Sequence, residues 1–135
     1  MSFALREHTA DVAIEAEGES LGETFAAVAD GLAAAQCDAI PDTGDRFEIE
    51  ERAESREALL FEFLDRLIYE RDVRAVLPAD HEATVGRDDE WIVRASTRGV
   101  PLADVRAREV KAVTYSEMAI EETDAGWRAY VVLDV

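Results

Sequence analysis

The chain closes with two apolar runs that flank the turn sequence Thr123-Asp124-Ala125-Gly126. A short connection ending in Gly between such runs predicts an antiparallel β-hairpin over residues 111–135. Every second residue of the last run is buried in this prediction, namely Trp127, Ala129, Val131 and Leu133. This period of two is typical of a strand with one buried face. Asp134 therefore points away from the main core.

Asp134 is followed by Val135 alone, so its carboxylate lies one residue from the terminal α-carboxylate. The nearest cationic side chain along the sequence is Arg128. Two hard oxygen anions this close together favour a bound counter-ion. The alternative is that Asp134 is a solvated polar residue at a frayed chain end.

The length of 135 residues predicts one domain, residues 1–135, large enough to bury a core without disulfides or metals. The hydrophobic fraction of 48% is typical of a globular chain. Cys37 is the single cysteine, so no intramolecular disulfide can form, and we expect a buried or half-buried thiol near a helix end. The sequence starts without a signal-peptide apolar region and contains no membrane-span pattern, which predicts a soluble cytoplasmic protein.

The formal net charge is -17, with 31 acidic residues against 14 basic ones, and Lys111 is the one lysine. Acidic residues occur throughout the chain, which indicates an acidic surface and not an acidic tail. Such a surface is stable where concentrated salt screens its self-repulsion, so we expect a halophilic protein. Clustered Lys and Arg are lacking in the sequence, which argues against direct binding to nucleic acid.

Two helices are predicted from their caps and apolar stripes. Ser20-Leu21-Gly22-Glu23 reads as a capping box and begins a helix that ends before Pro41. Ser55 is expected to cap a second helix with a broad apolar stripe. Glu62 and Arg66 have the i,i+4 spacing of an ion pair on its wet side.

The remaining periodic segments predict strands: an opening strand segment over about residues 3–17, a strand over 46–52, and two strand-like runs within 73–97 that meet at 86–90. Residues 99–110 read as a connection or edge segment, and His81, in a polar loop-like stretch, is assigned no role. This order predicts an α+β fold in which two helices pack on a mostly antiparallel sheet. Asp11 lies on the polar face of the opening strand, so Asp11 and Asp134 converge if the first and last strands are neighbours.

Five motifs, in order across nearly the whole chain, resemble the archease family: HTADV near the N-terminus, SLGETFAA, LLFEFLDRLIY, KAVTY and the terminal VVLDV. The resemblance implies a small α+β protein built from strand-helix-strand-strand modules that is not itself an enzyme. It also implies a partner, the RtcB-type RNA ligase that joins tRNA halves. Archeases promote guanylylation of the ligase active-site histidine, support its multiple turnover and can broaden the nucleotide it accepts.

The resemblance further implies a divalent cation, seen as calcium in the family, bound by Asp11, Asp134 and Val135; magnesium is the other candidate. Lys111 of KAVTY, by the same resemblance, belongs to the functional surface. Lys111 could instead pair with one of the many carboxylates, yet a compact ammonium is not interchangeable with the planar guanidinium found at all other basic positions. Ser116 stands where family members often have His.

His8 is a further candidate site residue, because it begins the HTAD motif. It is either part of the partner-activating surface or a strand residue hydrogen-bonded to backbone. A rival function is a small metal-dependent hydrolase that uses Asp11, Asp134 and His8 as ligands and a metal-bound water as nucleophile. That rival lacks an evident general base and a substrate-binding loop in the sequence.

Overall fold

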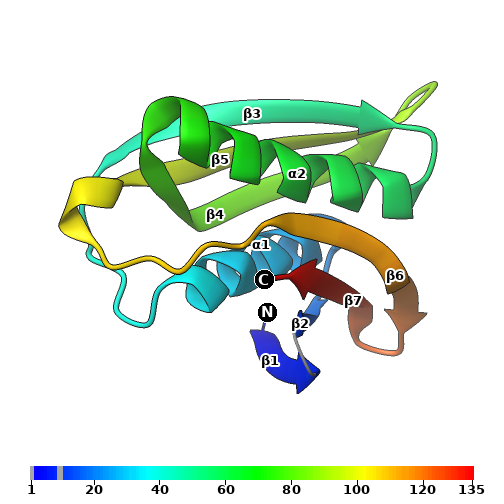
Figure 1. The fold of residues 1–135 in the computed structure, drawn as a ribbon. Helices are drawn as coiled ribbons and strands as arrows, with labels where there is room; N and C mark the ends of the chain where they lie inside the picture. The colour runs from blue at the N-terminus through cyan, green and yellow to red at the C-terminus, as the bar shows by residue number, and fades with distance from the viewer. Residues whose placement is uncertain (1, 9–10) are drawn as a thin grey trace.

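Two antiparallel sheets and two helices make up the computed structural model (Figure 1). The structure describes residues 2–8 and 11–135, and the side chains of residues 2–5 and 11–135. Along the chain the elements are β1 (Ser2–His8), β2 (Asp11–Gly18), α1 (Leu21–Gln36), β3 (Asp45–Ala53), α2 (Arg56–Arg74), β4 (Val76–Arg87), β5 (Trp91–Pro101), the short 3-10 helix η1 (Leu102–Asp104), β6 (Ala112–Thr123) and β7 (Gly126–Asp134). The predicted α+β class is confirmed, with two helices packed on antiparallel sheets.

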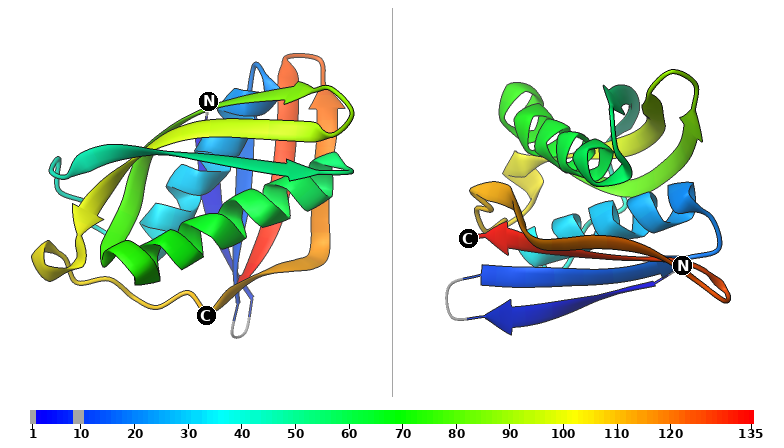
Figure 2. Two further views of the ribbon diagram at one scale, coloured as in Figure 1. Left: turned by 90° about the horizontal axis from the view of Figure 1, so that it is seen from above. Right: turned by 90° about the vertical axis from the view of Figure 1, so that its right-hand side faces the viewer.

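One sheet has the strand order β1-β2-β7-β6 and the other has the order β3-β5-β4. In both, a strand is followed by a helix and then by a hairpin whose second strand pairs with that first strand. Two strand-helix-strand-strand modules therefore make up the fold. The first module consists of β2, α1, β6 and β7, and the second, β3-α2-β4-β5, is inserted between α1 and β6 of the first. Figure 2 shows α1 between the two sheets, with α2 alongside.

Both helices begin at the predicted serine caps. The Ser20 hydroxyl accepts a hydrogen bond from the Glu23 N–H at 3.1 Å, and the Glu23 carboxylate accepts one from the Glu19 N–H at 3.0 Å. The Ser55 hydroxyl likewise accepts from the Ala58 N–H at 3.1 Å. The bonds from the N–H groups of Glu23 and Ala58 satisfy backbone donors that the first helical turns leave free, and the bond from the Glu19 N–H ties the preceding residue to α1.

The core forms where the two helices meet the inner faces of both sheets. Phe25 of α1 and Phe63 of α2 are fully buried and stack with ring centroids 6.1 Å apart. Ile14 of β2 and Leu133 of β7 are also fully buried in the same cluster. Because side chains alternate along a strand, this burial directs Asp11 and Asp134 to the opposite, outer face of the sheet.

Three sequence interpretations need correction. The opening segment is a hairpin of two strands, β1 and β2, and not a single strand run. Arg66 pairs with Glu51 at 3.1 Å and with Glu70 at 3.8 Å, instead of with Glu62, because its side chain reaches strand β3. His81 lies in β4 and is buried, instead of lying in a polar loop.

The connection from η1 to β6 is fastened to the end of α1. The Arg108 N–H donates to the Gln36 carbonyl at 2.6 Å, and its guanidinium pairs with Asp38 at 2.8 Å. These contacts hold the irregular segment across the C-terminal end of α1, where Cys37 is buried as expected. Within the described part of the chain, no helix is long and apolar enough to cross a membrane.

Candidate functional site: an acidic pair at the β2–β7 junction

Asp11 and Asp134 are direct partners in the antiparallel pairing of β2 with β7. Residues paired in this way carry their side chains on the same face, with Cβ atoms about 4.5–5.5 Å apart. Asp11 is half-buried and Asp134 is exposed. The predicted convergence of the two acidic residues from opposite ends of the chain is therefore present in the pairing register.

Two like charges directly opposite each other in a sheet are destabilising unless a cation compensates them. Among the described side chains the adjoining register pairs do not supply one, because Val12 lies opposite Leu133 and Ala112 lies opposite Asp134 on its other side. The nearest ion pair along these strands in the described structure joins Arg128 to Glu15, at 3.4 Å and several residues away. The carboxylate of the exposed Asp134 is therefore open to solvent.

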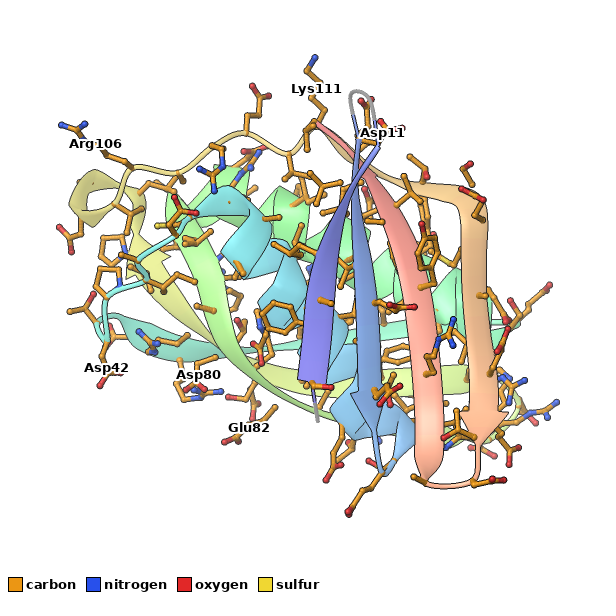
Figure 3. All side chains as sticks on the ribbon, turned by 90° about the horizontal axis from the view of Figure 1, so that it is seen from below. Asp11, Asp42, Asp80, Glu82, Arg106 and Lys111 are labelled. Carbon is orange, nitrogen blue, oxygen red and sulfur yellow. The ribbon has the colours of Figure 1, made fainter. Side chains whose placement is uncertain are left out.

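Lys111 is fixed beside this pair by its backbone. Its N–H donates to the Asp134 carbonyl at 2.9 Å, which extends the β6–β7 ladder by one bond. The Lys111 side chain is exposed and points away from the molecule, and Figure 3 shows it at the same end as Asp11. The Lys111 side chain is thus exposed to solvent at the end of the sheet that carries Asp11 and Asp134.

Val135 follows Asp134 immediately and is 39% exposed. Val135 therefore lies one residue beyond the end of β7. On the other side of Asp11, the backbone of His8 pairs with Asp11 in the β1–β2 hairpin. The His8 side chain lies outside the described part of the structure, so its predicted role stays a prediction.

The chemistry of the side chains at this end decides which metal ion they suit. Among the described residues, no group of three or more His, Cys, Asp or Glu side chains is arranged to hold one. Asp11 and Asp134 contribute two carboxylates, and the third protein ligand would be the α-carboxylate of Val135. An all-oxygen set of this kind fits Ca²⁺ or Mg²⁺, because these cations prefer oxygen and complete their shells with water. We call this group, Asp11, Asp134, Val135 and Lys111, the acidic tip.

The strand that leads away from Lys111 is irregular, which the sequence did not reveal. The β6–β7 register shifts between Thr114 and Ala119, and Glu117 has a positive φ of 58°. Tyr115, at the start of this bulge, stacks on Phe61 of α2 with ring centroids 4.3 Å apart and planes 5° apart. The Lys111–Tyr115 motif is thus anchored to β7 at one end, through the Lys111 N–H, and to α2 at the other, through the Tyr115 ring.

Comparison with known proteins gives the same family that the sequence motifs resemble, and the match covers residues 3–135. The model of the Archease protein family matches residues 3–135. A protein archease of Pyrococcus furiosus is 34% identical over 96% of this chain and 95% of its own length, and one of Archaeoglobus fulgidus is 31% identical over 100% of both. The solution structure of protein 1598 of Methanobacterium thermoautotrophicum has a TM-score of 0.86 at 27% identity, covering 99% of each chain.

These matches define a class of protein with this interleaved α+β fold and this sequence pattern. An archease crystal structure from Thermotoga maritima, at 23% identity and a TM-score of 0.66, shares the fold. The chain belongs to the archease family.

Proposed function

We propose that this archease is an accessory protein that activates an RtcB-type tRNA-splicing ligase by promoting its guanylylation and multiple turnover. The observation that carries the proposal is the direct pairing of Asp11 with Asp134 beside the backbone-anchored Lys111. Family membership supports this choice of partner, and the pairing of the two carboxylates beside Lys111 supports this end of the sheet as the surface that acts on it. The protein in this proposal has no catalytic residue of its own.

A divalent cation at the acidic tip would offset the carboxylate charges and offer coordination to phosphate oxygens of a nucleotide. Calcium is the first candidate and magnesium the second. Asp11 and Asp134 would hold the cation from neighbouring strands, and the rigid β2–β7 ladder would fix their separation. The exposed Lys111 ammonium would attract the anionic nucleotide as the tip approaches its partner.

The test is covalent guanylyl transfer to the ligase from the same source, with the accessory protein substoichiometric. Asp11→Ala and Asp134→Ala should each abolish stimulation while keeping the wild-type circular dichroism spectrum. Asp124→Ala is the matched control, because Asp124 is an exposed aspartate in the turn at the other end of the same hairpin. Folded Asp11→Ala and Asp134→Ala proteins that stimulate like wild type would refute the proposal.

The hydrolase alternative is separated by incubating the protein alone with metal and generic phosphoesters. An accessory protein should show no turnover without the ligase. Turnover that disappears in Asp134→Ala would favour the hydrolase.

A further inference from the structure

The outward side of helix α2 exposes two large apolar side chains. Tyr69 is 58% exposed and Val73 is 60% exposed. Residues four apart in a helix are neighbours on its surface, so these two side chains form one patch. The exposed residues of the segment 61–73 fall within a sector of about 100° around the helix axis, and they are Glu62, Asp65, Tyr69, Asp72 and Val73. We call these residues the α2 face.

Exposed aromatic surface is also present on the strand beside this helix. Tyr115 of β6 is 54% exposed and stacks on the half-buried Phe61 of α2. Large apolar side chains that are exposed singly are normal, whereas a group of them on one side of a molecule marks an interaction surface. Tyr is enriched in interfaces, because its rigid ring buries a large area at a low cost in conformational entropy.

The α2 face is acidic around its apolar pair. Its carboxylates belong to Glu62, Asp65 and Asp72. Asp72 pairs with Arg71 at 3.4 Å, whereas neither Glu62 nor Asp65 forms an ion pair with another residue that the structure describes. The face therefore presents negative charge to any molecule that approaches it.

Two other arginines of the same helix are held at strand β3. Arg66 pairs with Glu51 of β3 at 3.1 Å. The guanidinium of Arg74 lies 4.1 Å from the ring centroid of Phe47, in the same strand. Neither cation is therefore paired with a carboxylate of the α2 face.

The α2 face lies on the same side of the molecule as the acidic tip. Figure 1 shows α2, the connection that enters β6 and the C-terminus at the front, and the left view of Figure 2 shows the same arrangement from above. The segment from Lys111 to Tyr115 joins the two regions, since Lys111 bonds to Asp134 and Tyr115 stacks on Phe61. A partner that covers the α2 face therefore approaches the tip from the same side.

We propose that the α2 face, with Tyr115 at its edge, is the surface on which the RtcB-type ligase docks. This inference rests on the proposed function, which names that ligase as the partner. An enzyme that binds nucleotide and RNA phosphates carries cationic side chains around its binding site, and such a surface is complementary to the acidic α2 face. Tyr69 and Val73 supply the apolar centre of the contact, and the three carboxylates supply its charged rim.

Tyr69→Ala removes the centre of the contact. The affinity for the ligase from the same source, measured by titration calorimetry, should fall about tenfold, as expected for an aromatic side chain at the core of an interface. Alanine favours a helix more than tyrosine does, so the circular dichroism spectrum should stay as in wild type. Stimulation of guanylylation should still reach the wild-type maximum, at a higher concentration of the variant, because the acidic tip is unchanged. Tyr69→Phe keeps the ring and should bind as wild type does.

Asp65→Arg tests the charge on the α2 face. The variant brings like charges together at the contact and should weaken binding about tenfold. Asp89→Arg is the matched control, because Asp89 is an exposed aspartate in the loop between β4 and β5 and the net charge changes by the same amount. This control should bind the ligase as wild type does.

Specific results would overturn the inference. Unchanged ligase affinity in a folded Tyr69→Ala protein would exclude the α2 face from the contact. Equal weakening by Asp65→Arg and Asp89→Arg would show that overall charge attracts the ligase. If sedimentation shows that Tyr69→Ala abolishes self-association while the ligase affinity is unchanged, the face joins two copies of this chain. The proposed function fails separately, if the wild-type chain binds the ligase without stimulating guanylylation.

Discussion

The Arg56 guanidinium in the first turn of α2 lies 4.9 Å from the ring centroid of Trp127 in β7. The same guanidinium lies 5.9 Å from the Trp91 ring of β5, so one cation bridges an aromatic residue from each sheet. The two modules are therefore joined at this end by a cation–π contact as well as by the apolar core.

Replacing Arg56 by Met tests that bridge. The change keeps the apolar stem and removes the charge, so the free energy of unfolding should fall by about 1 kcal/mol. Urea denaturation followed by tryptophan fluorescence measures this fall without changing the salt concentration. Arg106→Met, at an exposed position that points away from the molecule in Figure 3, should change it by less than about 0.5 kcal/mol. Equal effects of the two variants would show that the bridge contributes nothing.

Salt dependence tests the halophilic interpretation of the net charge of -17. Lowering monovalent salt from about 1 M to about 0.1 M lengthens the screening distance from about 3 Å to about 10 Å. Repulsion among the many exposed carboxylates should then lower the melting temperature. A thermal melt at each salt concentration measures the effect, and a flat melting temperature would contradict the interpretation.

The α-carboxylate of Val135 can be moved without altering any side chain. Adding one glycine after Val135 displaces that carboxylate by a residue, so binding of Ca²⁺ should weaken if it is a ligand. Titration calorimetry of the wild-type and extended chains measures the change. The same affinity in both chains would exclude Val135 from the cation site.

Lys111→Arg tests whether the tip needs a compact charge. The hydrogen bond of Lys111 to Asp134 is made by the backbone, so the substitution should leave the melting temperature unchanged. Stimulation of ligase guanylylation should nevertheless fall, because a guanidinium is planar and larger than an ammonium. Full stimulation by a folded Lys111→Arg protein would show that charge alone is sufficient.

The ion pair of Asp38 with Arg108 makes a pH-dependent contribution to stability. The hydrogen bond from Arg108, followed by its positive charge, holds the pKa of Asp38 below its ordinary value of 3.8. A carboxyl whose pKa is lowered in the folded state stabilises that state above its unfolded pKa and loses this effect as the pH falls through the folded value. Wild type should therefore be more stable than Asp38→Asn at pH 7, by an amount that shrinks below about pH 4. Thermal melts of both proteins across this range measure it, and a constant difference would contradict the assignment.

Much of this architecture could be predicted because its signals are local. The serine caps, the apolar stripe of α2 and the Gly126 turn each act within a few residues of sequence. The juxtaposition of Asp11 with Asp134 followed from strand alternation together with the condition that the first and last strands pair. The cation preference and the ligase partner came from family resemblance, which no local pattern contains.

Other features could not be predicted because they depend on irregular backbone or on distant contacts. No Gly, Pro or Asn separates His8 from Asp11, so the sequence gives no turn signal for the opening hairpin. The bulges at Asp80 and at Glu117 break strand alternation, which makes His81 look like a loop residue and hides the stacking of Tyr115 on Phe61. The pairing of Arg66 with Glu51 instead of Glu62 likewise depends on a strand that helical spacing cannot reveal.

The insertion of one module into the other determines when the acidic tip can exist during synthesis of the protein. Asp11 emerges from the ribosome early, whereas β7 emerges after the whole of β3-α2-β4-β5. A nascent chain that stalls before β7 carries one half of the acidic pair and lacks the edge on which β2 completes its hydrogen bonds. Assembly of the tip joins residues far apart in the sequence and is therefore a late folding event, and a chain truncated before β7 would lack the tip.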